Sequence, residues 1–214
     1  MIWGLDGARG GWVLSRRIPS SRSGAEVFFC LSLAEVLDFT GSERVAVDMP
    51  IGLATAASPQ RKWDVDARRV LRGRLSSRVF TPPIQEVLNS ASYAEANQRS
   101  KALIGKGISV QAWNLVPKIR ELEATLQTSP ELSVRWEEAH PEIAFAKLNG
   151  GAPIVESKKT DKGEQIRGEL LRRSAGIRFD SIWSDFSKAG VRGRFARDDV
   201  LDSLALAASE IAFP

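Results

Sequence analysis

The amino-acid sequence predicts an α/β protein with a mixed five-stranded sheet in the order 3-2-1-4-5, flanked by helices. Three observations lead to this prediction. Three apolar strand patterns follow one another before residue 32, another apolar run comes after a helical pattern, and helical periodicity dominates from about residue 58 onward. Strands joined by short turns pair antiparallel, whereas strands joined through a helix pair parallel, so both pairings are expected in one sheet.

The first two strands are predicted at residues 2–6 and 11–18 and are joined by a glycine-rich turn. Glycine permits the backbone angles of a tight turn and lets other groups come close to the main chain. A third strand at 26–31 follows a serine-rich link. Because the connections are short, these three strands are expected to pair antiparallel.

A crossover to a parallel strand is predicted next. Apolar residues at helical spacing after Ser32, a residue type that caps helices, predict a short helix at 33–37. The run at 44–48 is nearly all apolar, as in a buried parallel strand. Pro50 and Gly52 follow it and end the strand.

A helical insert is predicted at approximately 55–130, between the fourth and fifth strands. Its helices are expected at residues 62–71, 84–101 and 111–126. The fifth strand is predicted at 132–138. Later helices are expected to begin near Pro141, Lys162 and Asp198. Residues 1–214 are therefore expected to form a single domain that carries this insert.

Composition argues against several classes of protein. Hydrophobic residues make up 43% of the chain and charged residues 26%, as in ordinary soluble domains, and a net charge of +4 does not by itself indicate nucleic-acid binding. Cys30 is the only cysteine, so neither an intrachain disulfide nor a cysteine zinc cluster can form. His140 is the only histidine and no Gly-x-Ser-x-Gly elbow is present, which argues against acyl transfer. Without a secretory signal pattern or an apolar run of about 20 residues, we expect a soluble, cytoplasmic protein.

Asp6 and Asp48 each end an apolar strand pattern. Aspartate is common in turns, where it bonds nearby backbone N–H groups, so each could be structural. However, strands one and four are expected to lie parallel, about 4.7–4.9 Å apart, with their carboxyl ends at the edge where open α/β sheets bind ligands. Two carboxylates that close repel each other unless a cation lies between them. A hard divalent metal ion is therefore the expected partner.

The last predicted helix begins with three acids, Asp198, Asp199 and Asp202. Asp199 and Asp202 are three residues apart and share a helix face. Acids in a first turn also interact favourably with the positive end of the helix dipole, and they can cap the helix. Capping needs only one of the three, so we favour Asp199 and Asp202 as metal ligands, with Asp198 as the substitute.

Glu138 and Glu142 flank His140 near the end of the fifth strand, where Asp48 should also lie. Either glutamate is a candidate to bind a metal or to orient a water molecule. Glu142 is equally suited to cap the helix that follows.

The segment Arg72–Arg78 combines glycine, two hydroxyls and several arginines. Such a loop can bind phosphate through bidentate arginine contacts and backbone amides, or it can be a solvated basic surface. Lys158 and Lys159 are weaker candidates of the same kind.

Six segments, in order and from end to end of the chain, carry a resemblance to a known family. They are Gly4–Trp12, Val47–Gly52, Arg74–Phe80, Ser109–Trp113, His140–Glu142 and Asp199–Ala205. They resemble the family called domain of unknown function 429, whose members are predicted nucleases of the ribonuclease H-like superfamily. The resemblance implies a ribonuclease H-like fold with acids on strand one, at the end of strand four and on the last helix. These acids fall on Asp6, Asp48, Asp199 and Asp202.

The Asp199-x-x-Asp202 ending is similar to that of the Holliday-junction resolvase branch, which usually has glutamate on the fourth strand, where this chain has Asp48. We therefore expect a metal-dependent nuclease whose four aspartates hold two Mg²⁺ or Mn²⁺ ions about 3.5–4 Å apart, with nucleic acid as the partner. His140 or Glu138 is expected to relay a proton. Substrate binding is expected at Arg9, Arg74, Ser76, Ser77, Arg78, Gln111 and Glu142.

Other classes of function stay open. One is a catalytically silent module that binds nucleic acid or a nucleotide. Another is a phosphotransferase of the actin and sugar-kinase type, which needs two such halves and a second phosphate loop, for which 214 residues leave no room. A third is a nuclease fold that acts on a small nucleotide-like molecule. The pattern fits DNA and RNA alike, and a monomer and a homodimer alike.

Overall fold

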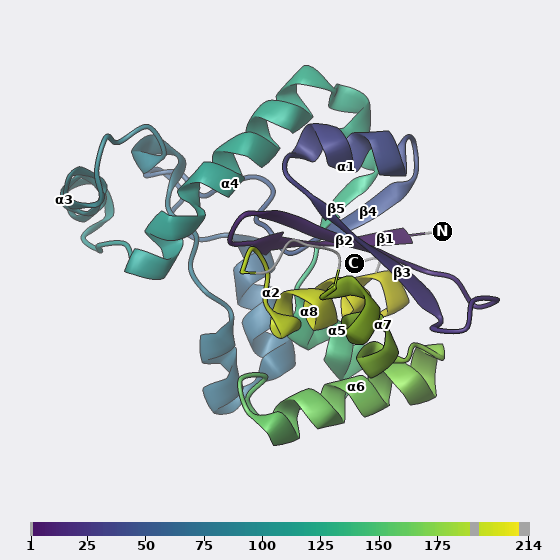
Figure 1. Ribbon diagram of the computed structural model, residues 1–214. Helices are drawn as coiled ribbons and strands as arrows, with labels where there is room; N and C mark the ends of the chain where they lie inside the picture. The colour runs from purple at the N-terminus through teal and green to yellow at the C-terminus, as the bar shows by residue number, and fades with distance from the viewer. Residues whose placement is uncertain (1, 189–192, 210–214) are drawn as a thin grey trace. The chain divides into compact units, whose positions relative to one another are not determined.

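The computed structural model, which describes residues 2–188 and 193–209, contains a mixed five-stranded sheet (Figure 1). The strand order is β3-β2-β1-β4-β5, so the predicted order and the mixed pairing are confirmed. β1 pairs antiparallel with β2 and β2 with β3, whereas β4 lies parallel to both β1 and β5. The strands are β1 Ile2–Ala8, β2 Gly11–Arg17, β3 Ala25–Cys30, β4 Arg44–Val47 and β5 Trp136–Glu138.

The chain divides into two compact units. The first contains the described residues within 1–49 and 129–214, and the second is residues 50–128. The range expected for the helical insert overlaps this second unit. The whole sheet belongs to the first unit, together with α1 Leu33–Thr40, η3 Pro130–Val134, α5 Pro141–Leu148, α6 Asp161–Ala175, α7 Phe179–Phe186 and α8 Arg197–Ser209.

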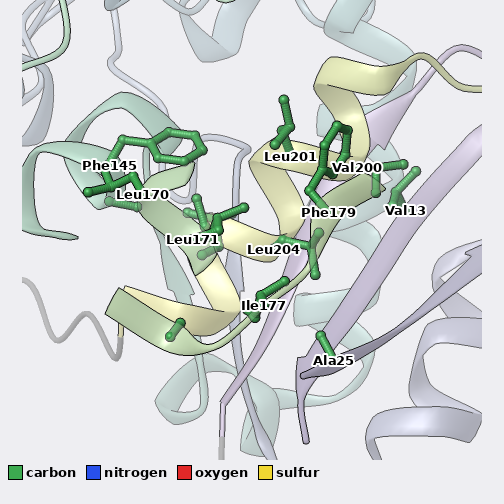
Figure 2. Packing of buried hydrophobic residues seen from close by; sticks show 14 of the residues in the cluster. Val13, Ala25, Phe145, Leu170, Leu171, Ile177, Phe179, Val200, Leu201 and Leu204 are labelled. Carbon is green, nitrogen blue, oxygen red and sulfur yellow. The ribbon is translucent and has the colours of Figure 1, made fainter. Parts of the chain in front are cut away.

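Helices flank both faces of the sheet in the first unit, as predicted. α1 lies on one face and α8 on the other, with α5, α6 and α7 on the side of α8 (Figure 1). α8 packs on β1 and β2 and is covered in turn by α5 and α6. This double burial explains why its sequence is apolar on nearly all sides. Figure 2 shows side chains of α8, among them Leu201 and Leu204, in the core that also contains Val13 of β2 and Leu171 of α6.

Gly4 sets how closely α8 approaches the sheet. A Cβ atom placed on Gly4 would lie 2.6 Å from the backbone nitrogen of Ala207 and still closer to the carbonyl oxygen of Ser203. Real Cβ atoms do not come that close to other atoms, so the glycine permits direct contact between the backbones of β1 and α8. The helix is therefore seated against the middle of β1.

The prediction of a strand over 132–138 is wrong in its first half. Residues Pro130–Val134 form a 3₁₀ helix, and the strand begins only at Trp136. The N–H of Leu132 donates to the carbonyl of Ser129 at 2.9 Å, and the Ser133 hydroxyl donates to the carbonyl of Pro130 at 2.6 Å. Proline has a fixed φ that suits the start of a helical turn, and here this local preference outweighs the strand-like composition.

The second unit contains α2 Lys62–Leu71, η1 Gly73–Arg78, η2 Gln85–Val87, α3 Tyr93–Ile104 and α4 Val110–Thr128. The prediction of one helix over 84–101 is wrong, because a new helix begins after Ser92. The Ser92 hydroxyl accepts a bond from the N–H of Glu95 at 3.2 Å, and the Glu95 carboxylate accepts from the N–H of Ala91 at 2.9 Å. This local pair is close to a capping box, a start signal that is readable in the sequence Ser-Tyr-Ala-Glu.

α7 was not predicted, and it packs its aromatic side chains against Phe195, with the ring centroids of Phe186 and Phe195 4.5 Å apart.

Over residues 2–188 and 193–209, no helix combines the length and the apolar character that crossing a bilayer requires.

Candidate active site

The parallel pairing of β1 with β4 places Asp6 and Asp48 in adjacent positions. Leu5 is in register with Val47, and the N–H of Asp48 donates to the carbonyl of Leu5 at 2.9 Å. Residues in register on parallel strands face the same side of the sheet, and this side alternates along each strand. Gly4 faces α8, so Asp6, two residues further, faces α8 as well. Asp6 is 6% exposed, and its Oδ1 accepts a bond from the N–H of Gly7 at 2.9 Å.

α8 brings Asp199 and Asp202 to the same place. Asp202 is 1% exposed, and within the described part of the chain its Oδ1 has no hydrogen-bond partner. Its Oδ2 accepts a bond from the ammonium of Lys158. Asp199 is half-buried, and its Oδ2 accepts from the N–H of Ala196 at 2.8 Å. Asp199 therefore accepts a hydrogen bond from the backbone at the start of α8, which is the structural role that the sequence also allowed for it. Among the residues that the structure describes, Asp202 makes no such bond to the start of the helix.

The pKa values of these acids show that they lie within electrostatic range of one another. Burial raises the pKa of Asp6 well above its usual value, and repulsion by Asp48, Asp202 and Asp199 raises it further. Burial raises the pKa of Asp48 to about 6, although attraction to Lys158 and a hydrogen bond with the Asp6 side chain oppose the rise. Burial also raises the pKa of Asp202 to about 7, against the attraction of Lys158. Three elements distant in sequence thus place their acids in one site.

Lys158 is the cation of this site. It lies in the loop before α6, which begins after the capping residue Thr160. Its ammonium contacts Asp202 and lies 3.8 Å from a carboxylate oxygen of Asp198. Burial by itself would lower the pKa of Lys158, but attraction to Asp202, Asp6 and Asp48 raises it overall, so the side chain stays charged. From the sequence, Lys158 was only a weak candidate for phosphate binding, because no spacing pattern connects it to the acids.

The donor set fits a hard divalent cation chemically. Carboxylate oxygens are the ligands that Mg²⁺ and Mn²⁺ prefer, and a buried carboxylate oxygen such as Asp202 Oδ1, for which the described residues supply no partner, is costly without a cation. As it stands, however, no group of three or more His, Cys, Asp and Glu side chains in the described ranges is arranged to hold a metal ion. In this arrangement the positive charge next to Asp202 belongs to Lys158.

His140 and Glu142 lie at the start of α5 and have structural partners. His140 caps α5, and its Nδ1 accepts a bond from the N–H of Glu142 at 3.2 Å. The Glu142 carboxylate accepts two bonds from Arg167, at 2.7 and 2.9 Å, and Arg167 is 0% exposed. Repulsion by Glu142 is one of the effects that raise the pKa of Asp48, so Glu142 lies within electrostatic range of the site. Roles in proton relay or in substrate binding stay predictions.

Glu138 and Arg9 are placed differently. Glu138 is in register with Val47, so strand alternation turns it toward the face of the sheet opposite Asp6 and Asp48. Arg9 is exposed in the turn between β1 and β2, three residues beyond Asp6.

The other expected substrate-binding residues belong to the second unit. The expected arginine loop is the 3₁₀ helix η1, in which the Ser76 hydroxyl donates to the carbonyl of Gly73 at 2.7 Å. The Ser77 hydroxyl donates to the carbonyl of Arg74 at 2.8 Å. Arg74 and Gln111 are exposed and Arg78 is half-buried. Substrate binding by these residues stays a prediction.

The fold and the site define an α/β protein with a cluster of buried acids at the carboxyl edge of the parallel strands. A family model described as "Protein of unknown function (DUF429)" matches residues 4–212. The chain belongs to this family, and the resemblance found in the sequence is confirmed at that level. Searches of curated proteins and of solved structures gave no match.

Proposed function

We propose that the protein is a metal-dependent nuclease of the ribonuclease H-like type, which hydrolyses phosphodiester bonds at Asp6, Asp48, Asp199 and Asp202. The observation that carries the proposal is the meeting of acids from β1, the end of β4 and α8, among which Asp202 Oδ1 is buried and without a partner in the described ranges. The strand order also supports it, because the superfamily has this order.

Each acid has a proposed role. Asp6 and Asp202, the two most buried carboxylates of the site, would hold the cation, with Asp48 and Asp199 completing the ligand set. A bound Mg²⁺ or Mn²⁺ ion supplies Lewis-acid chemistry, since it lowers the pKa of an attacking water and neutralises the leaving oxygen. The apolar core around α8 excludes bulk water and keeps the acids in place.

Nucleic acid is the proposed substrate. Exposed Arg9, close to Asp6 in the chain, is suited to bind a flanking phosphate. Arg74 and Arg78 of the second unit are proposed to bind further phosphates, a role that would make binding weaken steeply with salt.

Cleavage assays on single-stranded and double-stranded DNA and RNA, with Mn²⁺ or with EDTA, test the proposal. The Asp6→Asn and Asp202→Asn variants should lose Mn²⁺-dependent cleavage and keep the circular dichroism spectrum of the wild type. Asp38→Asn is the matched control, because Asp38 is an exposed aspartate on α1, at the opposite face of the sheet. Full activity of D6N would rule the mechanism out. Salt-sensitive binding without cleavage would favour the silent binding module instead.

A further inference from the structure

Lys158 and the Arg167–Glu142 pair show two different ways of neutralising a buried acid. Arg167 is 0% exposed and binds both carboxylate oxygens of Glu142. Of the two carboxylate oxygens of Asp202, Lys158 contacts only Oδ2, and Oδ1 has no partner among the described residues. In the first pair both carboxylate oxygens of Glu142 have a partner, although Arg167 Nε has none among the described residues. The second leaves Asp202, which is more deeply buried than Glu142, only partly compensated.

Lys158 also has room to move. Its side chain is 32% exposed, whereas that of Asp202 is 1% exposed. Lys158 lines an open cavity of about 270 Å³ together with Lys159, Thr160 and Asp198. An extended lysine side chain is flexible, so its ammonium can leave Asp202 for this solvent-connected space without disturbing the core. The aspartates, held by β1, β4 and α8, cannot move away in the same manner.

We propose that the Lys158 ammonium is an internal counter-ion, which compensates the acids in the metal-free protein and is displaced from Asp202 when a divalent ion binds. The inference rests on the proposed function, because that function requires the ion. It explains why the acids are gathered while no group of them within the described ranges is arranged to hold a metal as it stands. Lys158 thus competes with the metal for Asp202.

Calorimetric titration of Mn²⁺ into the metal-free full chain tests this competition. Lys158→Met keeps an unbranched side chain without the charge, and it should bind Mn²⁺ more tightly than the wild type, on the order of tenfold or more. Without metal the same variant should melt at a lower temperature, because Asp202 loses its cation. Lys158→Arg should resemble the wild type. Lys159→Met is the matched control, since Lys159 is the exposed neighbour in the chain, and it should change neither quantity.

A measurement on the wild type keeps the test independent of how the variants fold. Acetylation by a limiting amount of an acetylating reagent, followed by mass spectrometry, should modify Lys158 more slowly than Lys159 in EDTA. Addition of Mn²⁺ should raise the rate at Lys158 and leave Lys159 unchanged. A Lys158 rate that does not respond to Mn²⁺ overturns the inference.

The two proposals fail in different ways. Equal Mn²⁺ affinity in K158M and the wild type, with cleavage intact, overturns the role of Lys158 and leaves the nuclease standing. Tighter Mn²⁺ binding by K158M in a protein that cleaves no nucleic acid supports the counter-ion and removes the nuclease. Absence of Mn²⁺ binding in both proteins overturns both.

Discussion

The N–H of Asp48 donates to the carbonyl of Leu5 at 2.9 Å, and this one bond extends the pairing of β4 with β1 beyond the last residue of β4. It places Asp48 beside Asp6 on the face that α8 covers. The two carboxylates are thus brought together by backbone geometry. The site therefore does not depend on flexible loops for its first two acids, and substitutions there should change charge without changing the fold.

Asp48→Asn should stabilise the metal-free protein at alkaline pH. The pKa of Asp48 in the folded chain is about 6, above the ordinary 3.8. A carboxyl with a raised pKa contributes stability that is fully present below the unfolded-state pKa and is lost as pH rises through the folded-state pKa. The ionised side chain therefore costs stability above about pH 6. In EDTA at about pH 8, D48N should melt about 2–5 °C higher than the wild type.

The same pair of proteins supplies the control for this prediction. At about pH 3, below both the ordinary pKa of 3.8 and the folded-state pKa, Asp48 is mostly protonated in the folded and in the unfolded wild type, so the difference in melting temperature should shrink. Asp38→Asn should change little at either pH. A D48N protein that melts below the wild type at about pH 8 would contradict the assignment of a raised pKa.

Gly4→Ala should unfold the first unit or weaken it severely. The added Cβ would lie 2.6 Å from the Ala207 nitrogen, so β1 and α8 would have to separate. Overpacking against backbone atoms that cannot yield should cost about 3 kcal/mol or more. Urea denaturation measures the cost. Gly168→Ala is the matched control, because its nearest contacts, atoms of Phe179, are 3.8 Å away and alanine favours a helix. It should be neutral or stabilising.

Arg167→Met should cost about 3–5 kcal/mol of unfolding free energy, because it leaves Glu142 buried without its cation. Arg172→Met tests the same chemistry at the surface, where the Arg172 and Glu169 side chains are 60% and 50% exposed. That change should cost far less, because exposed ion pairs are screened by solvent. Chemical denaturation of both variants gives the comparison. Equal losses would show that burial does not set the strength of the Arg167–Glu142 pair.

Cys30 should be unreactive in the native protein. Its side chain is 0% exposed, and burial, with a smaller effect of Glu35, raises the pKa of the thiol to about 12. Since the thiolate is the reactive form, a thiol reagent at about pH 8 should label the protein only after denaturant is added. Fast labelling of the folded protein would show that β3 opens readily.

The sequence predicted the strand order and the meeting of Asp6 with Asp48, because both follow from where apolar runs end and from how parallel strands align. It did not predict the partners that span loops. Lys158 binds an aspartate 44 residues further along the chain, and Arg167 binds a glutamate 25 residues before it. No periodic pattern connects such positions. The metal, the nuclease activity and the nucleic-acid substrate stay predictions.

Local turn chemistry accounts for the errors in secondary structure. Pro130 starts a 3₁₀ turn where the composition suggested a strand, and Ser92 with Glu95 starts a helix in a range expected to be continuous. Both signals are short. The first lies beside a strand-like run, and the second lies inside a longer helical pattern that it divides. Both signals can be read in the sequence, but helix or strand propensity averaged over a longer stretch of residues hides them.

The seating of α8 on Gly4 has a consequence for the protein during its synthesis. The strands that carry Asp6 and precede Asp48 are made before Arg197–Ser209, which follows all the other helices and strands of the first unit in the chain. A nascent chain that has not reached this segment has two of the four acids and no completed site. The proposed nuclease would therefore be inert toward the messenger RNA and ribosomal RNA around it until α8 had been synthesised.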